Sequence, residues 1–383
     1  MAEPNRSRPA PSNEPRPADD TRFLPLEIRA PTEDAKCLES RLESLDAEVT
    51  PTRQFFVRSH FPVPRIDAAT WRVVIDGDVE RPLSLTLEDL RDLPHRTVQS
   101  VLECAGNSRM TVRPKPEGVL WGHGAVSAAR WSGVALRDVL KLAGPKPTAI
   151  EVLFEGADHG AEPGVAREIP YQMSVSLPKA LEDDTLLADG MNGTPLPPSH
   201  GFPVRAIVPG WYGMASVKWL TRITVTSERF AGYFRTRAYA YIREGDAPDT
   251  PTDPATTIRV KSLITWPREG QVLAPGPHRI RGVAWSGNGR VVRVEVSADP
   301  PTAKGGYWQD ARVAPAPSPR SWVHWELLCD LPTSGFHVLR VRATDEIGNV
   351  QPAEAEWNFR GLGNNSVHSV PIEVRPGGPP DSA

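Results

Sequence analysis

The chain has 383 residues, of which 39% are hydrophobic and 24% are charged, so a globular core can form and two or three domains are expected. The formal net charge of −3 argues against a nucleic-acid-binding surface, which would need a basic field. No apolar run approaches the roughly 18 residues that a membrane span requires, so we predict no membrane partner.

Residues 1–50 are predicted to form a disordered or extended tail. Five prolines between residues 4 and 17 lie among charged residues, and this stretch is too polar to pack. Order is expected to begin near Phe55. The tail has neither an apolar signal core nor a twin-arginine motif, which favours a cytoplasmic location.

Residues 51–250 show a mixed pattern of strands and short helices. Trp71–Asp76 is predicted to be a strand that ends in an Asp-Gly turn. Thr86 followed by Asp89 resembles a capping box, and the helix that it begins is expected to stop at Pro94.

A second helix is predicted where apolar residues recur at helical spacing. The residues are Leu136, Val139, Leu140 and Ala143. Gly144 and Pro145 are expected to end this helix. Residues 192–201 then form a proline- and glycine-rich connection of a length that is usually functional inside a compact domain.

Residues 251–383 have the texture of an all-β unit. An acidic, proline-containing stretch at residues 244–254 precedes it. Val291–Val296 and Val338–Arg342 alternate between apolar and polar residues, with glycine and asparagine turns between such segments. Short strands at this spacing predict a β-sandwich of immunoglobulin type.

The three cysteines are widely spaced and predict neither a disulfide framework nor a Cys-x-x-Cys metal pair, which favours a reducing compartment. A lone cysteine is commonly a small buried apolar group. Cys104, however, is followed by Ala105-Gly106-Asn107, which would let a bulky group approach, and then by Arg109, which favours the thiolate. Spacing alone leaves open whether Cys104 is a metal ligand or a nucleophile.

Several cationic side chains accompany this cysteine. Arg58 and His60 would share one face of an extended stretch. His200 and Arg205 lie on either side of an apolar strand entry, and Lys218 stands between Val217 and Trp219. Each residue alone is compatible with a structural role. Together they supply the donors that a large anionic cofactor requires.

Four motifs in order resemble the sulfite oxidase family. They are F-F-V-R-S-H at 55–60, C-A-G-N-S-R at 104–109, H-G-F-P-V-R at 200–205 and P-G-W-Y-G-M-A-S-V-K-W-L at 209–220. The likeness runs from about residue 50 to the C-terminus. It implies an α+β fold, with a mixed, mainly β molybdopterin-binding catalytic domain at 51–250 and an all-β immunoglobulin-like dimerisation domain at 251–383.

The resemblance also implies a molybdenum–molybdopterin cofactor, with Cys104 as the metal ligand. A soft thiolate suits a metal that is already held by sulfur. The matched cofactor-binding positions are Phe56, Val57, Arg58, Ser59, His60, Asp158, His200, Arg205, Ser216, Val217 and Lys218.

The matched substrate pocket is an anion site beside the metal. Its members in this chain, together with Cys104, are Arg58, Arg109, Trp121, Tyr239 and Arg360, with Tyr241 close to Tyr239 in sequence. Sulfite is a small dianion that guanidinium donors suit. The implied reaction is oxidation of sulfite to sulfate by oxo transfer.

The chain departs from the family pattern at several positions. Ser59 stands where animal and plant members usually have asparagine, and Ser108 replaces the first arginine of C-A-G-N-R-R. Glu117 falls near a lysine of those members, although Lys115 is close. These changes bear on substrate affinity more than on cofactor binding.

The chain has no C-x-x-C-H haem site, and no haem is expected. Electrons would pass to oxygen or to a separate carrier such as a cytochrome c, and a homodimer is expected. Within the fold, a sulfane dehydrogenase-like enzyme is the main alternative, and a nitrate reductase-like enzyme is another. A cofactor-free binding scaffold and a Cys104 hydrolase are the alternatives from other classes.

Overall fold

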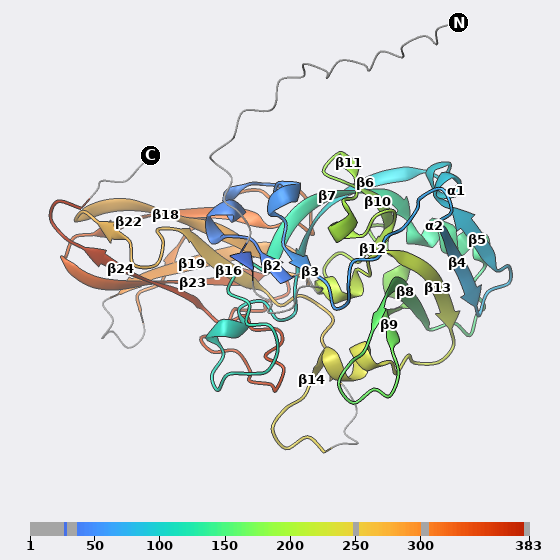
Figure 1. Ribbon diagram of the computed structural model, residues 1–383. Coiled ribbons are helices and arrows are strands. Elements are labelled where there is room, and N and C mark those ends of the chain that lie inside the picture. Colours follow the sequence, from blue (N-terminus) through green and yellow to red (C-terminus); the bar gives the residue numbers. More distant parts are fainter. Residues whose placement is uncertain (1–26, 29–36, 248–252, 300–305, 379–383) are drawn as a thin grey trace, which may run out of the picture.

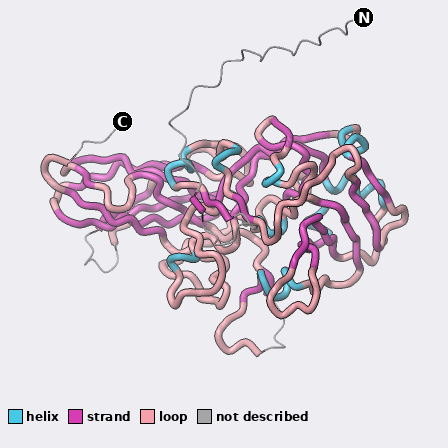
Figure 2. The backbone as a smooth tube through the Cα atoms, viewed as in Figure 1, coloured by secondary structure: helices cyan, strands magenta, loops and turns pink. Residues whose placement is uncertain are grey.

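The computed structural model describes residues 27–28, 37–247, 253–299 and 306–378. Figure 1 shows two parts side by side in an elongated molecule: a first region up to residue 247 and a sandwich region from residue 253. Strands and loops make up most of the backbone, and the helices are short (Figure 2). None of the helices that the structure describes has the length and apolar character of a membrane span.

The first region contains all of the described helices. Its strands are β1 (Glu27–Ile28), β2 (Cys37–Glu39), β3 (Val57–Arg58), β4 (Arg72–Gly77), β5 (Leu83–Thr86), β6 (His95–Glu103), β7 (Val126–Ala135), β8 (Glu151–Gly160), β9 (Ile169–Ser176), β10 (Leu186–Met191), β11 (Thr194–Pro195), β12 (Arg205–Ile207), β13 (Leu220–Thr226) and β14 (Ala240–Tyr241). Its helices are α1 (Leu87–Arg91), α2 (Leu136–Ala143) and α3 (Leu177–Ala180), the 3-10 turns η1 (Leu42–Asp46), η2 (Thr52–Gln54), η3 (Arg109–Thr111), η4 (Pro198–His200) and η5 (Gly213–Ala215), and the π-helix η6 (Phe234–Ala238).

Two sheets form the body of this region. One has the order β5-β4-β13-β8-β9, in which β4 and β13 run parallel. The other has the order β11-β10-β7-β6, with β12 also paired to β10. The candidate site lies at the ends of these strands, because Cys104 follows β6, Asp158 lies near the end of β8 and Arg205 begins β12.

The local predictions for this region are confirmed. Strand β4 ends at Gly77, whose φ of +83° allows the turn. Helix α1 begins at a complete capping box between Thr86 and Asp89. Helix α2 buries its apolar stripe and ends at Gly144, with a φ of +70°. Periodicity and capping were sufficient here because both signals are local.

The expected onset of order near Phe55 is wrong for residues 37–50. Strand β2 pairs with β3, and turn η1 packs against the sandwich strand β16. Cys37 is 2% exposed and Leu45 is fully buried. These residues contain apolar side chains that the proline-rich start of the chain lacks. The rest of the predicted tail, residues 1–26 and 29–36, lies outside the described residues.

The sandwich region consists of two facing sheets. Their orders are β16-β18-β22-β21 and β17-β24-β23-β19-β20. The strands of the region are β15 (Asp253–Pro254), β16 (Lys261–Trp266), β17 (Val272–Leu273), β18 (Gly276–Trp285), β19 (Val291–Asp299), β20 (Gln309–Asp310), β21 (Arg312–Val313), β22 (Val323–Leu331), β23 (Gly335–Asp345) and β24 (His368–Val374). The alternating segments therefore form β19 and β23, as predicted, while the immunoglobulin-like topology stays a prediction.

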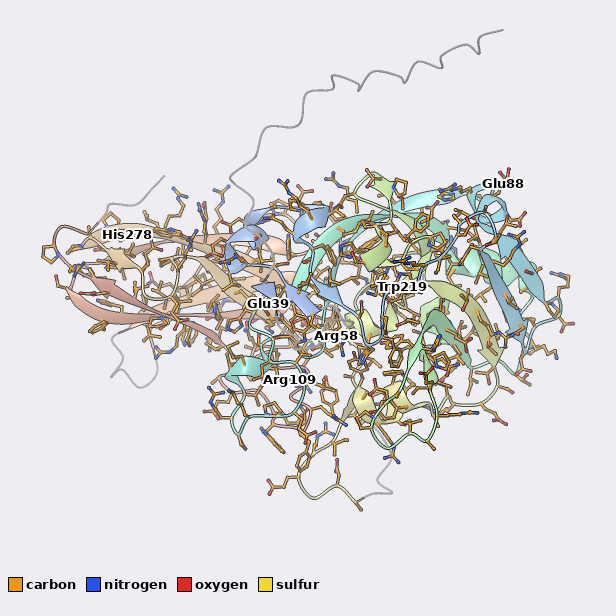
Figure 3. All side chains as sticks on the ribbon, viewed as in Figure 1. Glu39, Arg58, Glu88, Arg109, Trp219 and His278 are labelled. Atoms are coloured by element: carbon orange, nitrogen blue, oxygen red, sulfur yellow. The ribbon has the colours of Figure 1, made fainter. Side chains whose placement is uncertain are left out.

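The two regions share an apolar contact. Leu263, Val283, Trp285 and Trp322 of the sandwich region belong to the same buried cluster as the core of the first region. A second cluster fills the sandwich itself. Burial of such large side chains favours a fixed arrangement of the two regions. The candidate site lies near this junction, where Figure 3 places Arg58 and Arg109.

Candidate active site

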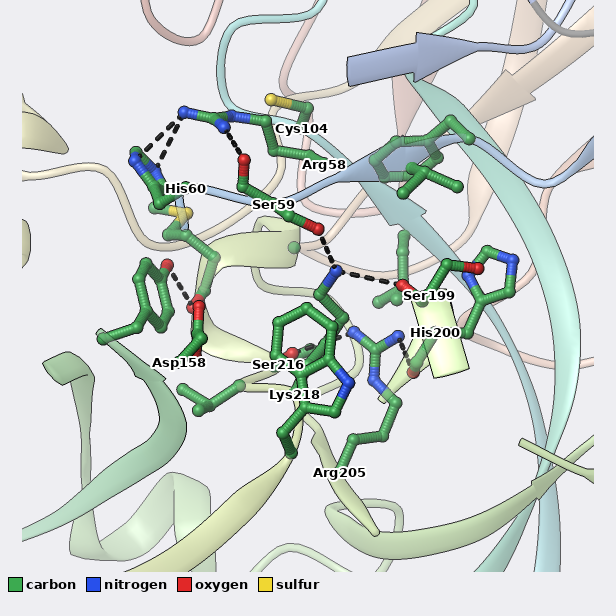
Figure 4. A pocket seen from close by; sticks show the side chains of 18 of the residues that line it. Arg58, Ser59, His60, Cys104, Asp158, Ser199, His200, Arg205, Ser216 and Lys218 are labelled. Carbon is green, nitrogen blue, oxygen red and sulfur yellow. Dashed lines mark hydrogen bonds between the residues drawn. The ribbon is translucent and has the colours of Figure 1, made fainter. Parts of the chain in front are cut away.

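All residues predicted to bind the cofactor line one cavity of the first region, which we call the first cavity. They are Phe56, Val57, Arg58, Ser59, His60, Asp158, His200, Arg205, Ser216, Val217 and Lys218. Cys104 and Tyr239 line it too. Segments that are far apart in sequence therefore meet here, and Figure 4 shows their side chains facing a common space.

A second cavity adjoins the first and holds the six residues predicted for catalysis. They are Arg58, Cys104, Arg109, Trp121, Tyr239 and Arg360. Arg58, His60, Cys104 and Tyr239 line both cavities. The structure thus brings together every residue predicted for the site, including Arg360 from the sandwich region.

Cys104 follows the last residue of β6 and is a free thiol that is 8% exposed. Its backbone N–H donates to Ala125 O (2.9 Å), and its carbonyl accepts from Asn107 N (2.8 Å). Gly106 leaves room for Arg109, because a Cβ at Gly106 would lie 2.6 Å from Arg109 Nη2. Burial raises the pKa of the Cys104 thiol, and the charge of Arg109 opposes this effect.

Two cations, the buried Arg205 and the partly buried Lys218, lie on the far side of the first cavity (Figure 4). Lys218 Nζ donates to Ser59 Oγ (2.8 Å) and to Ser199 O (3.0 Å). Arg205 donates to the carbonyls of His200 (2.9 Å) and Ser216 (2.8 Å). Burial lowers the Arg205 pKa to about 9, and burial with the neighbouring Arg205 charge lowers the Lys218 pKa well below its ordinary value. An anion in the cavity would reverse both effects.

Asp158 presents an acceptor to the same cavity. Its Oδ1 is buried and has no hydrogen-bond partner in the structure. Burial raises the pKa of this carboxyl to about 6, although the Lys218 charge opposes the shift. Gly156 makes room for the carboxyl, since a Cβ there would lie 2.5 Å from Asp158 Oδ1. Because this acceptor faces the cavity, it is available to a donor group of a ligand or a water molecule.

A hydrogen-bonded group connects the two cavities. Arg58 Nη2 lies 3.0 Å from His60 Nδ1, and His60 Nε2 lies 2.6 Å from Tyr239 Oη. Burial, followed by the Arg58 charge, lowers the His60 pKa to about 4. His60 is therefore neutral at pH 7, and the positive charge of this group resides on Arg58.

Arg109 and Arg360 approach the second cavity from different regions. Arg109 Nε donates to the carbonyl of Arg360 (2.8 Å), and Arg109 Nη1 donates to Val119 O (2.9 Å). The Arg360 side chain is 35% exposed and lies 3.8 Å from the carboxylate of Glu117. Trp121 is 1% exposed and both lines this cavity and belongs to a buried cluster that includes Cys104.

Cys37 and Glu162 are among the residues of the second cavity that sequence reasoning missed. Cys37 lies opposite Arg58 in the β2–β3 pairing, and it escaped notice because residues 37–50 were expected to be unstructured. Glu162 Oε1 lies 3.5 Å from His60 Nδ1. Glu162 stands in the polar loop between β8 and β9, where no spacing or motif distinguishes it from solvated carboxylates.

Comparisons with known proteins agree with this arrangement. The oxidoreductase molybdopterin binding domain matches residues 60–234, and the Mo-co oxidoreductase dimerisation domain matches residues 253–375. The chain is 40% identical over 340 residues to sulfite oxidase of Gallus gallus, which covers 84% of this chain and 72% of that one. The chain belongs to the sulfite oxidase family. It is thus an oxidoreductase with a molybdopterin-binding domain followed by a β dimerisation domain.

The chain is also similar to other proteins over most of its length. Mitochondrial sulfite oxidase of Homo sapiens is 40% identical over 349 residues, covering 86% of this chain but 62% of the human protein. A nitrate reductase [NADH] of Ulva prolifera is 35% identical over 366 residues, covering 86% of this chain and 41% of that protein. The solved sulfane dehydrogenase SoxCD of Paracoccus pantotrophus has a TM-score of 0.77 and 29% identity, with 94% of each chain covered.

Proposed function

We propose that this protein oxidises sulfite to sulfate with a molybdenum–molybdopterin cofactor that Cys104 holds through its thiolate. One observation carries the proposal. The thiol, the side chains of Arg205 and Lys218 and an unpartnered buried carboxyl line one cavity, and three arginines line the adjoining one. Without an anionic ligand, the arginine and lysine side chains of the two cavities would outnumber the carboxylates that compensate them.

The donors and acceptors of the first cavity fit such a cofactor. Lys218 and Arg205 would bind its phosphate, and Asp158 would accept hydrogen bonds from amino groups of the pterin. Backbone and side-chain groups of residues 56–60, with His200 and the run 216–218, would hold the remainder. When bound, the cofactor supplies the two-electron redox chemistry and the oxygen transfer.

In the second cavity, the chain itself binds and orients sulfite. Arg58, Arg109 and Arg360 would place their guanidinium groups around the dianion, with Trp121 as a wall and the Tyr239 hydroxyl as a further donor. The neutral His60 leaves the charge of Arg58 available to the anion. Arg360 is partly exposed, so it would contact the product sulfate, which is also a dianion, where sulfate leaves the cavity.

Electrons would then pass to oxygen or to a separate carrier such as a cytochrome c. We further propose a two-fold homodimer through the dimerisation domain, a domain boundary near residue 250, and a cytoplasmic location. A closed dimer of this kind would use the same patch on both copies.

Two measurements test the proposed function. Protein produced with molybdate should contain about one molybdenum and one pterin per chain, by elemental analysis and pterin fluorescence, because one Cys104 thiolate holds one metal. The loaded protein should reduce an artificial acceptor when sulfite is added. Cofactor-containing protein that does not oxidise sulfite but oxidises a sulfane sulfur compound would favour the sulfane dehydrogenase alternative. Protein without metal and pterin would contradict the proposal.

Replacing Arg360 with methionine should weaken sulfite binding without affecting the cofactor. A hydrogen bond to a charged group is worth about 1.5–3 kcal/mol, which corresponds to about a tenfold to hundredfold loss in kcat/KM. Molybdenum content and Tm should stay unchanged, because Arg360 lines the second cavity and not the first. Steady-state sulfite kinetics and thermal unfolding check this. Normal kinetics with a lowered Tm would assign Arg360 a structural role only.

Replacing Asp158 with asparagine should stabilise the cofactor-free protein at neutral pH. The folded-state pKa of about 6 exceeds the ordinary value of 3.8, so the folded protein binds a proton more tightly than the unfolded chain. Stability of the wild type therefore falls as pH rises from about 4 to about 6, by on the order of 3 kcal/mol, and asparagine removes this loss.

Urea unfolding of both cofactor-free proteins at pH 4 and pH 7 measures the effect. The two proteins should be similar at pH 4, and the variant should be more stable at pH 7. The variant should also retain less pterin when loaded, since the amide loses one acceptor. A stability difference that is the same at both pH values would show that the Asp158 carboxyl does not titrate as described.

A further inference from the structure

A buried ion pair connects the strand that precedes Cys104 to the sandwich region. Lys261, the first residue of β16, is 2% exposed, and its Nζ lies 3.2 Å from Oε1 of Glu103, which is 3% exposed. Nζ also donates to Ser108 Oγ (2.8 Å) and to Asn364 O (2.8 Å). All three N–H donors of the ammonium group are used. Two of the three acceptors lie on residues that flank Cys104.

The Glu103 carboxylate is saturated in the same way. Its Oε1 also accepts from Asn107 Nδ2 (3.0 Å), and its Oε2 accepts from Trp285 Nε1 (2.8 Å). Trp285 is the last residue of β18 in the sandwich region. A buried ion pair is tolerated only when its remaining hydrogen-bonding groups are satisfied, and here the satisfying groups come from the Cys104 loop and the sandwich.

Ser108 closes the other end of the loop. Its φ of +67° is uncommon for a residue other than glycine, so its surroundings must hold this conformation. Its Oγ accepts from Lys261 and contacts His123 Nδ1 (2.8 Å), and its carbonyl accepts from Asn364 Nδ2 (2.9 Å). Ala125 contacts Cys104 and Asn107, whereas Ser108 is held from both regions, by Gly122 O of the first region (2.6 Å) and by Lys261 and Asn364 of the sandwich region.

We infer that Lys261 is a positioning residue, which fixes residues 104–108 (the Cys104 loop) and thereby the place at which the thiol enters the cavity. The sandwich region then contributes to the site in two ways, through Arg360 in the second cavity and through Lys261 behind the first. The functional meaning of the inference rests on the proposed role of Cys104. The contacts between Lys261 and the Cys104 loop involve the chain alone, so the positioning role can be tested without cofactor.

The three free cysteines report on the loop in the full-length, cofactor-free protein. We would measure the alkylation rate of each cysteine by iodoacetamide, using peptide mass spectrometry. In Lys261→Met, the rate at Cys104 should rise about tenfold relative to Cys329, because local opening exposes the thiol without unfolding the domain. Cys329 is the internal reference, since it is 2% exposed in the same region as Lys261.

Lys179→Met is the matched control. Lys179 is 6% exposed, and its Nζ lies 2.6 Å from Glu182 and 2.7 Å from Pro209 O, so the same chemistry is removed at a place that does not touch the loop. The ratio of the Cys104 and Cys329 rates should be unchanged in this variant. Equal rises at both cysteines in Lys261→Met, or an unchanged ratio, would overturn the inference.

The double variant Lys261→Met with Glu103→Gln distinguishes loss of the Lys261 hydrogen bonds from the effect of leaving the Glu103 carboxylate without a counter-charge. It also allows the test to proceed if the single variant fails to fold. The ratio should remain raised, because Ser108 and Asn364 still lack their ammonium donor. A ratio that returns to the wild-type value would mean that charge balance alone holds the loop, which contradicts the inference. A different result would contradict the proposed role of Cys104 as metal ligand. In that case Cys104→Ser would retain the metal, while Lys261→Met would still raise the alkylation rate of Cys104 relative to Cys329.

Discussion

Cys104→Ser should abolish sulfite turnover while the protein keeps its fold. A hydroxyl is a hard and weakly acidic ligand, so it cannot replace a thiolate on a metal that is bound by sulfur. Serine is close to cysteine in size, so the change leaves the shape of the buried cluster around position 104 nearly unaltered. Activity, molybdenum content and Tm measured on the same preparation check the expectation.

Cys329→Ser is the matched control for this substitution. Cys329 is also free and buried, but it lies on β22 in the sandwich core and lines neither cavity. Cys329→Ser should lower the stability of the protein somewhat and leave activity per molybdenum unchanged. Comparable loss of activity per molybdenum from both substitutions would remove the reason for assigning the metal to Cys104.

Lys218→Met should reduce the molybdenum and pterin content by about tenfold or more. A charge-assisted hydrogen bond to a buried phosphate is worth about 1.5–3 kcal/mol, and methionine fills the same space without the charge. The cofactor-free variant should be at least as stable as the wild type, since burial disfavours the lysine charge there. Metal analysis and urea unfolding of the loaded and cofactor-free forms measure both effects.

Arg360→Met serves as the control for Lys218→Met. Both changes remove one cation from the site, but Arg360 lines the second cavity alone. The two variants should therefore lose different properties. Lys218→Met should have a lowered cofactor content, and Arg360→Met should have a lowered kcat/KM for sulfite. Normal cofactor content in Lys218→Met would show that the cations of the first cavity do not bind the phosphate.

Local patterns predicted much of the fold. Helices α1 and α2 were recognisable because capping and an apolar stripe act within one or two turns, and β19 and β23 because alternation reflects one buried face. The extent of order at residues 37–50 was not recognisable. Those residues are ordered by pairing with β3 and by packing against the sandwich, and neither partner is adjacent in sequence.

The site residues could be predicted because four motifs occur in the same order as in the family. The spacing of single residues alone did not identify the site. Glu162 and Lys261 had no such support. Lys261 begins β16, a strand whose first five residues are buried, whereas a lysine is rarely buried completely. The approach of Glu103 from the other region explains its burial. Contacts of this kind depend on tertiary packing across more than a hundred residues, which no local pattern records.

The cations of the first cavity have a consequence for the amount of this protein that a cell can maintain. Lys218 and Arg205 have neutral groups as hydrogen-bond partners, and the single carboxylate of Asp158 faces three cations of the cavity, so the chain alone compensates their charge only in part. A cofactor that binds only the folded state shifts the folding equilibrium by mass action. Starvation for molybdate or pterin would then lower the steady-state level of the folded chain through proteolysis of the cofactor-free form, and enzyme abundance would follow cofactor supply without any change in transcription.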